Sequence, residues 1–433
     1  MNILGIETSC DETAAAVVKD GREILSNVVV SQIDIFAKYG GVIPEVAARS
    51  HLEAMMPVIE KALNDANCTW DNIDAIAVTH APGLLGSLLI GTLTARTLAI
   101  LHKKPLYAVH HLKSHIYANW LNSAGENGLK QSAGSSSHFY NGHGRVSGTE
   151  IPVRDRLTRC ENDDCGPRTF QDASPVLFPL LALVVSGGHT QILYMPAHNT
   201  FEIIGTTHDD AVGECFDKVA KILGLPYPGG PSIAKSAKNG DENKYKLPHP
   251  KVENLDFSFS GLKTAVLRAV QKELNLPISH PSHDLKNHLS EQQVADFAAS
   301  FQKTAVDILC EKLSLALQDH PEVKSIALAG GVSANELLRT RVAEMSHRRA
   351  SGAWQGEDER RSPVATGRAD AAQGESVSDR PHAFFPAPHL SGDNGAMVAA
   401  AAYYEIQSGI HPTAPYSLNL YPRISIEIQG RNS

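Results

Sequence analysis

Apolar runs of strand length alternate with helix-spaced apolar residues along this chain, and this alternation limits the fold more than any other feature of the sequence. In residues 1–121 we predict a strand at 2–7, a turn at 8–13, a second strand at 14–18 and a helix at 51–64. A third strand follows at 73–78, then a turn at 82–87 and a second helix that runs to about residue 101. Strands that alternate with helices across polar or glycine-rich turns predict an α/β layered domain.

The alternation is interrupted twice by a change of composition. Residues 122–176 and 348–380 are rich in small and mixed-charge residues and lack a periodic apolar face, which predicts two low-complexity surface insertions. Between and after them we expect strands at 180–185, 191–194 and 325–329, and helices at 211–223, 294–317, after 335 and up to about 407. The expected organisation is therefore a first lobe at 1–121, a second lobe at 177–347 and a C-terminal segment at 381–433.

Composition narrows the class of protein. The 433 residues carry a net charge of -8, which excludes an extended basic coat for nucleic acid but allows a local patch or a partner subunit to bind it. No apolar run approaches the ~20 residues of a membrane span, and the first residues lack the pattern of a signal or transit peptide. Six scattered cysteines suit a reducing compartment. We expect a cytoplasmic protein that does not bind a membrane.

Four glycine-rich turns stand out, at residues 82–86, 186–188, 228–231 and 330–331. Free backbone N–H groups in such turns, and at the start of a following helix, favour an anion such as phosphate. A single turn of this kind usually supplies a positive φ angle and nothing more, but four in one α/β chain favour a nucleotide-type ligand. None fits the Rossmann or P-loop fingerprint, so a dehydrogenase and a P-loop enzyme are disfavoured.

His111 and His115 are four residues apart, so on a helix they would share a face and could hold a metal together. With 20 histidines in the chain, about one such pair is expected by chance, so the pair needs a third ligand to carry weight. Asp393, in a glycine-flanked turn, is the candidate. Two imidazoles and one carboxylate with open positions suit iron(II) or zinc as a Lewis acid.

Other chemistry-bearing residues leave alternatives open. Asp11 and Glu12, beside the first turn, are candidates for acid–base catalysis, although N-capping acids are equally expected there. Cys160 and Cys165 lie in the first insertion, where their spacing and the lack of a second pair make a zinc site a weak hypothesis. The chain has neither a Gly-x-Ser-x-Gly elbow nor a His-Glu-x-x-His motif, so serine hydrolases and common zinc proteases lose support.

Together these motifs closely resemble the tRNA N6-adenosine threonylcarbamoyltransferases, the TsaD or Gcp family, formerly labelled O-sialoglycoprotein endopeptidases. The matching segments are 5–13, 40–45, 82–86, 111–115, 185–190, 209–218, 227–231, 257–263, 329–335 and 393–396. They cover nearly all of the chain outside the two insertions and occur in the family's order.

The resemblance implies an actin/Hsp70/sugar-kinase-like (ASKHA) two-lobed α/β fold, in which the C-terminal helix returns to the first lobe. It implies transfer of the threonylcarbamoyl group from threonylcarbamoyl-AMP to N6 of adenosine 37 of tRNA, with release of AMP. The implied metal ligands are His111, His115 and Asp393, holding one divalent metal per subunit, iron(II) or alternatively zinc. The implied substrate contacts are Val184, Val185, Ser186, Gly187, Gly188, Asp217, Gly230 and Asn335. The implied partners are tRNA, a catalytically inactive paralogue and a small P-loop ATPase.

Two departures from the family pattern are visible. Ala234 stands where some members carry an aspartate that contacts the substrate, which puts this contact in doubt. The insertions are longer than in typical bacterial members, and we interpret them as surface decoration. A tRNA contact through Arg154, Arg156, Arg159 and Arg168 is the alternative, which is weakened by the acidic residues among them.

Three rival functions follow from the same residues. The phosphate-binding turns alone would fit a kinase or ATPase of the same fold, but the two imidazoles with Asp393 argue against it. A metalloprotease is disfavoured, because no general-base glutamate adjoins the histidine pair. The third rival, a non-catalytic scaffold paralogue, is disfavoured by the intact ligand set.

Overall fold

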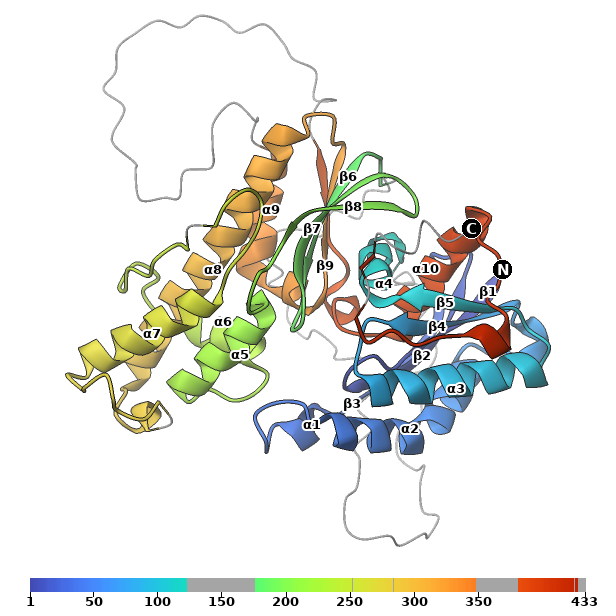
Figure 1. The fold of residues 1–433 in the computed structure, drawn as a ribbon, viewed down its shortest axis with the longest axis horizontal. Coiled ribbons are helices and arrows are strands. Elements are labelled where there is room, and N and C mark those ends of the chain that lie inside the picture. The colour runs from blue at the N-terminus through green and yellow to red at the C-terminus, as the bar shows by residue number, and fades with distance from the viewer. Residues whose placement is uncertain (123–175, 251, 283, 348–380, 424, 427–433) are drawn as a thin grey trace, which may run out of the picture. The chain divides into compact units, whose positions relative to one another are not determined.

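The computed structural model describes residues 1–122, 176–250, 252–282, 284–347, 381–423 and 425–426 (Figure 1). The chain divides into two compact units. Unit 1 comprises the described residues of Met1–Asp164 and Pro386–Gln429, and unit 2 those of Cys165–Phe385. Apart from their edge residues 122 and 176, both expected insertions lie outside the described residues, and so do Cys160, Cys165 and the four arginines named with them.

Unit 1 is built on a five-stranded mixed sheet with the order β3-β2-β1-β4-β5. Its strands are β1 (Asn2–Glu7), β2 (Glu12–Lys19), β3 (Glu23–Ser31), β4 (Ala75–Ala81) and β5 (Leu106–His110). Strand β1 pairs antiparallel with β2, from Asn2↔Lys19 to Glu7↔Ala14, and parallel with β4. β1 and β4 are almost wholly buried, as expected for central strands covered on both faces.

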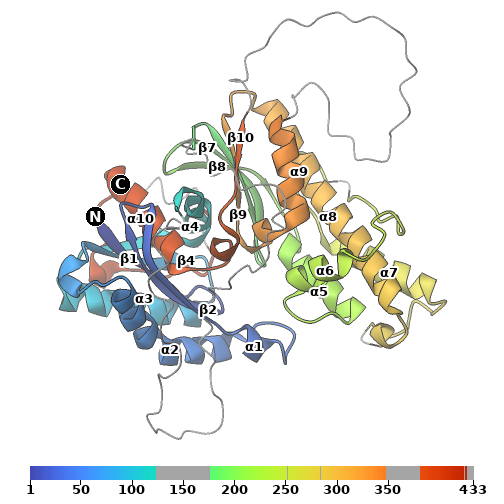
Figure 2. The ribbon, with the colours of Figure 1, turned by 180° about the vertical axis from the view of Figure 1, so that it is seen from behind.

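Helices cover both faces of this sheet. They are α1 (Ile33–Phe36), α2 (Pro44–Asp65), α3 (Leu85–Leu101), α4 (His111–Tyr117) and α10 (Gly395–Gln407). α2 and α3 pack side by side on one face, whereas α10 packs on β1 and β2 and contacts α4 (Figures 1 and 2). The approach of α10 is close enough to require glycine, because a Cβ on Gly5 would collide with the carbonyl oxygen of Gly395.

Unit 2 repeats this plan. Its sheet has the order β10-β9-β6-β7-β8, with β6 (Leu180–Val185), β7 (Thr190–Ala197), β8 (Thr200–Thr206), β9 (Ser325–Ala329) and β10 (His382–Phe384). Its helices are α5 (Val212–Leu223), α6 (Gly229–Ala237), α7 (Ser260–Glu273), α8 (Glu291–Asp319) and α9 (Glu336–His347). β10 pairs parallel with β9, so unit 2 extends to Phe385.

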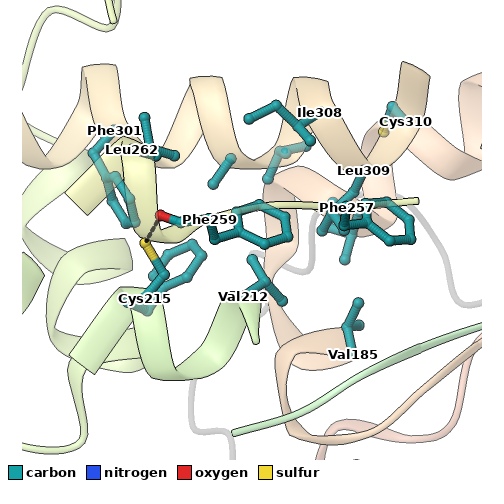
Figure 3. Packing of buried hydrophobic residues seen from close by; sticks show 14 of the residues in the cluster. Val185, Val212, Cys215, Phe257, Phe259, Leu262, Phe301, Ile308, Leu309 and Cys310 are labelled. Atoms are coloured by element: carbon teal, nitrogen blue, oxygen red, sulfur yellow. Dashed lines mark hydrogen bonds between the residues drawn. The ribbon is translucent and has the colours of Figure 1, made fainter. Parts of the chain in front are cut away.

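The core of unit 2 is filled by aromatic side chains from a segment without regular structure. Phe257 and Phe259, just before α7, are fully buried among residues of α5 and α8 (Figure 3). The thiol of Cys215 on α5 donates to the carbonyl of Phe259 at 3.5 Å, which ties this segment to the helix. Burying each phenyl ring contributes about 1.5–3 kcal/mol relative to leaving it exposed.

The two sheets share one topology. In each, three strands form an antiparallel meander, and two further strands then add parallel to the first, β4 and β5 in unit 1 and β9 and β10 in unit 2. Two α/β units of this kind agree with the ASKHA fold class that the resemblance implies. None of the described helices is long and apolar enough to cross a membrane.

Candidate functional site

Three side chains converge at the candidate metal centre of unit 1. His111 and His115 lie one turn apart on α4, and Asp393 precedes α10, whose N-cap is Asn394. The Oδ1 atom of Asp393 lies 3.1 Å from Nε2 of His115 and 3.6 Å from Nε2 of His111. The contact between α4 and α10 therefore unites ligands that are remote in sequence.

A buried carboxylate orients the first of these imidazoles. Glu7, the last residue of β1, is fully buried, and its Oε2 lies 3.2 Å from Nδ1 of His111. Thr79 donates to the same oxygen at 2.6 Å, and Ser9 Oγ lies 3.1 Å from the same ring nitrogen. A carboxylate on the far nitrogen of a histidine is the usual outer partner of a metal ligand. Sequence reasoning missed this role of Glu7, although a charged residue that ends an apolar strand was a visible signal.

The surroundings of His111 favour a positive charge. Burial lowers the pKa of His111, but the carboxylates of Asp393 and Glu7 outweigh it and raise the pKa from 6.5 to about 9. A divalent cation on Nε2 of His111 would replace the proton there and pair with Asp393, so metal binding would release that proton, whereas the Nδ1 proton would stay bonded to Glu7.

His115 provides the test of whether these residues fit a metal. Both of its ring nitrogens are buried, and neither has a hydrogen-bond partner among the described residues. Nε2 is within ion-pair distance of Asp393 but not in hydrogen-bonding geometry. An unsatisfied buried nitrogen costs about 1–3 kcal/mol, which coordination would offset. Two imidazoles and a carboxylate therefore fit iron(II) or zinc.

The turn after β1 and the first residue of β2 carry the two acids expected from the sequence. Asp11 is buried, and burial followed by the negative charge of Asp393 raises its pKa. Glu12, the first residue of β2, accepts a hydrogen bond from Ser31 of β3 at 3.3 Å. The negative charge at the candidate metal centre therefore affects the pKa of Asp11.

Two features hold this turn in place. Leu84 donates its backbone N–H to the carbonyl of Ser9 at 2.8 Å, which places the glycine-rich turn 82–86 against it. On the other side, His51 of α2 contacts Thr13 Oγ1 through Nδ1 at 2.8 Å and the carbonyl of Cys10 through Nε2 at 3.0 Å. Because a carbonyl can only accept, His51 is protonated on Nε2 and accepts from Thr13.

We expect acid to weaken unit 1 through His51. Burial lowers the pKa of His51 below the 6.5 of an exposed histidine. The unfolded chain therefore binds this proton more readily, so stability is complete above pH 6.5 and falls as the pH drops from there towards the lowered pKa. His51→Gln keeps one donor and one acceptor but does not titrate, and should flatten the fall of the melting temperature between about pH 7 and 5.

This slope is shared, because burial also lowers the pKa of His80 and of His389. The His51→Gln protein should therefore keep part of the slope. A slope identical to that of the unmodified protein would show that His51 does not contribute.

The glycine-rich turns of unit 2 are linked by backbone contacts. The carbonyl of Ser186, after β6, accepts from Gly213 N at 3.2 Å at the start of α5. Gly330, after β9, lies so close to Val185 that a Cβ would collide with its carbonyl oxygen. Asp217 of α5 accepts from Gly229 N at 2.7 Å, which connects the turn at 228–231. Three of the four predicted turns therefore belong to one connected region.

The expected substrate residues take different parts in this region. Val184 and Val185 are fully buried and paired within the sheet, so neither residue is exposed to a ligand in this structure. Added Cβ atoms on Gly187, Gly188 and Gly230 would meet nothing within 4 Å, so these backbones are open to close approach. The N–H of Ser186 is already bonded to the carbonyl of His189 at 2.8 Å.

Asn335 also has a structural role. Its Oδ1 accepts from Leu338 N at 3.1 Å at the start of α9, and its Nδ2 donates to Gln302 of α8 at 2.9 Å. Ala234, the departure from the family pattern, lies on α6.

The family model and the curated relatives that match this chain carry the same description. The sequence profile described as TsaD, tRNA N6-adenosine threonylcarbamoyltransferase, matches residues 23–153 and 168–352. A protein of that name from Symbiobacterium thermophilum is 40% identical over 99% of this chain and 98% of its own length. One from Bacillus cereus is 41% identical over 98% and 96%. Among solved structures, a ROK family glucokinase from Streptomyces griseus is 10% identical with a TM-score of 0.38, covering 93% of this chain and 98% of its own.

Proposed function

Because the chain belongs to the TsaD family of tRNA N6-adenosine threonylcarbamoyltransferases, we propose that it modifies adenosine 37 of tRNAs that read codons beginning with adenine. In this reaction, which we place in the cytoplasm, the threonylcarbamoyl group of threonylcarbamoyl-AMP is transferred to N6 of the adenosine and AMP is released. The observation that carries the proposal is the match to named relatives over almost the whole chain, together with the convergence of His111, His115 and Asp393.

The acceptor nitrogen sets the chemical problem. N6 of adenine is a weak nucleophile because its lone pair is delocalised into the ring. The protein must therefore make the carbamoyl carbon more electrophilic, stabilise AMP as the leaving group and accept a proton from N6.

The residues of unit 1 are suited to make the carbamoyl carbon more electrophilic and to accept the proton from N6. His111, His115 and Asp393 would hold iron(II) or zinc, which when bound supplies a Lewis acid for a carbonyl or phosphate oxygen. Glu7 keeps His111 in the tautomer and orientation of a ligand. Asp11, with its raised pKa, is the proposed acceptor of the N6 proton as the new C–N bond forms.

The turns of unit 2 address the leaving group. As the bond between the carbamoyl carbon and the phosphate oxygen breaks, negative charge grows on the phosphate of AMP. The open backbones of Gly187 and Gly188 are suited to hold that charge through their N–H groups. Because Ser186 N–H is already used, these two glycines carry the proposed contact.

The test is direct detection of the product. Purified protein, loaded with iron(II) or zinc, is incubated with threonylcarbamoyl-AMP, an unmodified tRNA for an ANN codon and the candidate partner subunits. The tRNA is then digested and examined for threonylcarbamoyladenosine by mass spectrometry. We expect product that depends on tRNA and on metal. Absence of product with a full partner set would favour a non-catalytic scaffold paralogue. ATP hydrolysis that does not depend on tRNA would favour a kinase or ATPase of the same fold.

We further propose that the partner is an inactive paralogue of the same fold and that it docks on α2 and α3. Five large apolar side chains on these two helices are exposed to solvent: Leu52, Met56, Leu85, Leu89 and Leu93. Both helices cover the same face of the sheet, so their outer sides form one surface (Figure 1). An exposed apolar surface built from two adjacent helices is typical of a protein–protein interface. The small P-loop ATPase subunit is proposed on the family resemblance.

The double substitution Leu89→Glu and Leu93→Glu should weaken binding of the paralogue about a hundredfold, because it places two charges in the apolar contact. Isothermal titration with the purified paralogue measures this. Ile278→Glu, the same change at a 70% exposed apolar residue of unit 2, is the matched control and should bind normally. Unchanged affinity of the double variant would exclude this surface.

A further inference from the structure

A second group of possible metal ligands lies in unit 2, in the connection between α7 and α8. His280, Asp284 and His288 each offer one ligand atom, and these atoms all lie within 4.8 Å of one another. Oδ2 of Asp284 lies 3.1 Å from Nε2 of His280 and 3.2 Å from Nε2 of His288. Both imidazoles thus turn the same ring nitrogen towards a single carboxylate oxygen.

The surroundings hold these three side chains in a defined arrangement. Asn287 donates to the other oxygen of Asp284, Oδ1, at 2.9 Å, which leaves Oδ2 for the imidazoles. The buried side chain of Gln271 on α7 donates to the carbonyl of His280 at 3.2 Å. Leu285, next to Asp284, is buried in the core of unit 2. The connection is therefore fixed at His280 and next to Asp284.

We propose that His280, Asp284 and His288 bind a zinc ion, or a related transition metal, that clamps the connection between α7 and α8. In a tetrahedral zinc site, with ligands at about 2.0–2.1 Å, neighbouring ligand atoms are about 3.3 Å apart. The two carboxylate–imidazole distances already match this value. Two imidazoles disfavour magnesium and calcium, which prefer oxygen ligands.

The exposure of the group suggests a structural ion with water as its fourth ligand. The side chains of His288 and Asp284 are 47% and 38% exposed, so solvent can reach the ion. His280 is tied to α7 through Gln271, whereas His288 stands just before Ser290, the N-cap of α8. An ion held by both would restrict the separation of these two helices. The proposed site is distinct in residues and in unit from the centre at His111, and it does not depend on the proposed function.

The test counts zinc ions on the full chain after treatment with a chelator. The unmodified protein should bind two zinc ions, one at each site. His288→Gln should lose one ion or bind it at least about a hundredfold more weakly, and Asp284→Asn should behave in the same way. His111→Ala should keep the ion of the α7–α8 connection. Cobalt(II) in place of zinc should give a tetrahedral absorption band that His288→Gln removes in the His111→Ala background.

Two further variants separate a built site from a surface hydrogen-bond network. Asn287→Ala should weaken zinc binding about tenfold, because Asp284 loses the partner that orients it. His249→Gln, which removes an exposed histidine paired with Glu311, is the matched control and should change nothing. Equal zinc content and affinity in His288→Gln and the unmodified protein would overturn the proposal. The proposal would also be overturned if the His111→Ala protein bound zinc only at millimolar zinc concentrations.

Discussion

Alanine at His111 is expected to abolish binding of the metal proposed for this centre and to reduce threonylcarbamoyl transfer by about a thousandfold. The substitution removes one of three ligands and leaves Glu7, a fully buried carboxylate, without its imidazole partner. Lewis-acid assistance is worth several kcal/mol, which corresponds to this loss of rate. The rate of threonylcarbamoyladenosine formation and the metal content of the same preparation measure the two effects together.

The matched control is His411→Ala, which removes an exposed histidine from the same unit and should leave both quantities unchanged. The metal count must distinguish this centre from the proposed site at His288, so it is best made in the His288→Gln background. Full metal occupancy and normal turnover in the His111→Ala protein would contradict the assignment of His111 as a ligand.

The second large effect is expected from Lys113→Met. Lys113 lies between the two histidines on α4, and its Nζ donates to Glu405 of α10 at 2.8 Å. Both side chains are almost fully buried. Burial raises the pKa of Glu405, and the ammonium group of Lys113 opposes this rise. Removing one partner of a buried pair leaves an uncompensated charge and typically costs about 3–5 kcal/mol.

Lys113→Met should therefore lower the melting temperature of unit 1 and, because the pair joins α4 to α10, weaken metal binding at His111. The double variant Lys113→Met, Glu405→Gln removes both charges and should recover most of the stability, since the remaining amide is neutral. Chemical denaturation of the two variants and of Glu405→Gln alone completes the cycle. A single variant as stable as the unmodified protein would show that Glu405 takes up a proton at little cost.

Much of the fold followed from the spacing of apolar residues. The strands at 180–185 and 325–329 and the helix ending at residue 407 agree with β6, β9 and α10. These elements are buried, so their apolar pattern is strong. Strands β3, β5, β8 and β10 were missed. β8 has no regular alternation and only one buried residue, and β10 has three residues, so it depends on pairing with β9.

The candidate site, like the fold, was predicted from the sequence only in part. The four-residue spacing of His111 and His115 would place both on one face of a helix, and the structure has both on α4, although no helix was predicted there. Asp393 was linked to them because it lies in a glycine-flanked turn and because the resemblance implies it as a ligand. In the structure it lies beside both histidines, since α10 packs against α4. The roles of Glu7 and of the buried pair Lys113–Glu405 arise from tertiary contacts between segments far apart in sequence, which local periodicity does not report.

The return of α10 to the sheet of unit 1 has a consequence for synthesis on the ribosome. The described part of unit 2 falls within one stretch of the sequence, Cys165–Phe385, whereas the described part of unit 1 is assembled from segments on either side of it. Domains generally fold as they emerge, from the N-terminal side. Here the face of β1 and β2 on which α10 packs stays uncovered until Gly395 and the rest of α10 have been synthesised. The nascent chain therefore exposes an apolar sheet face while unit 2 is being made, and ribosome-associated chaperones would be expected to bind it during that interval.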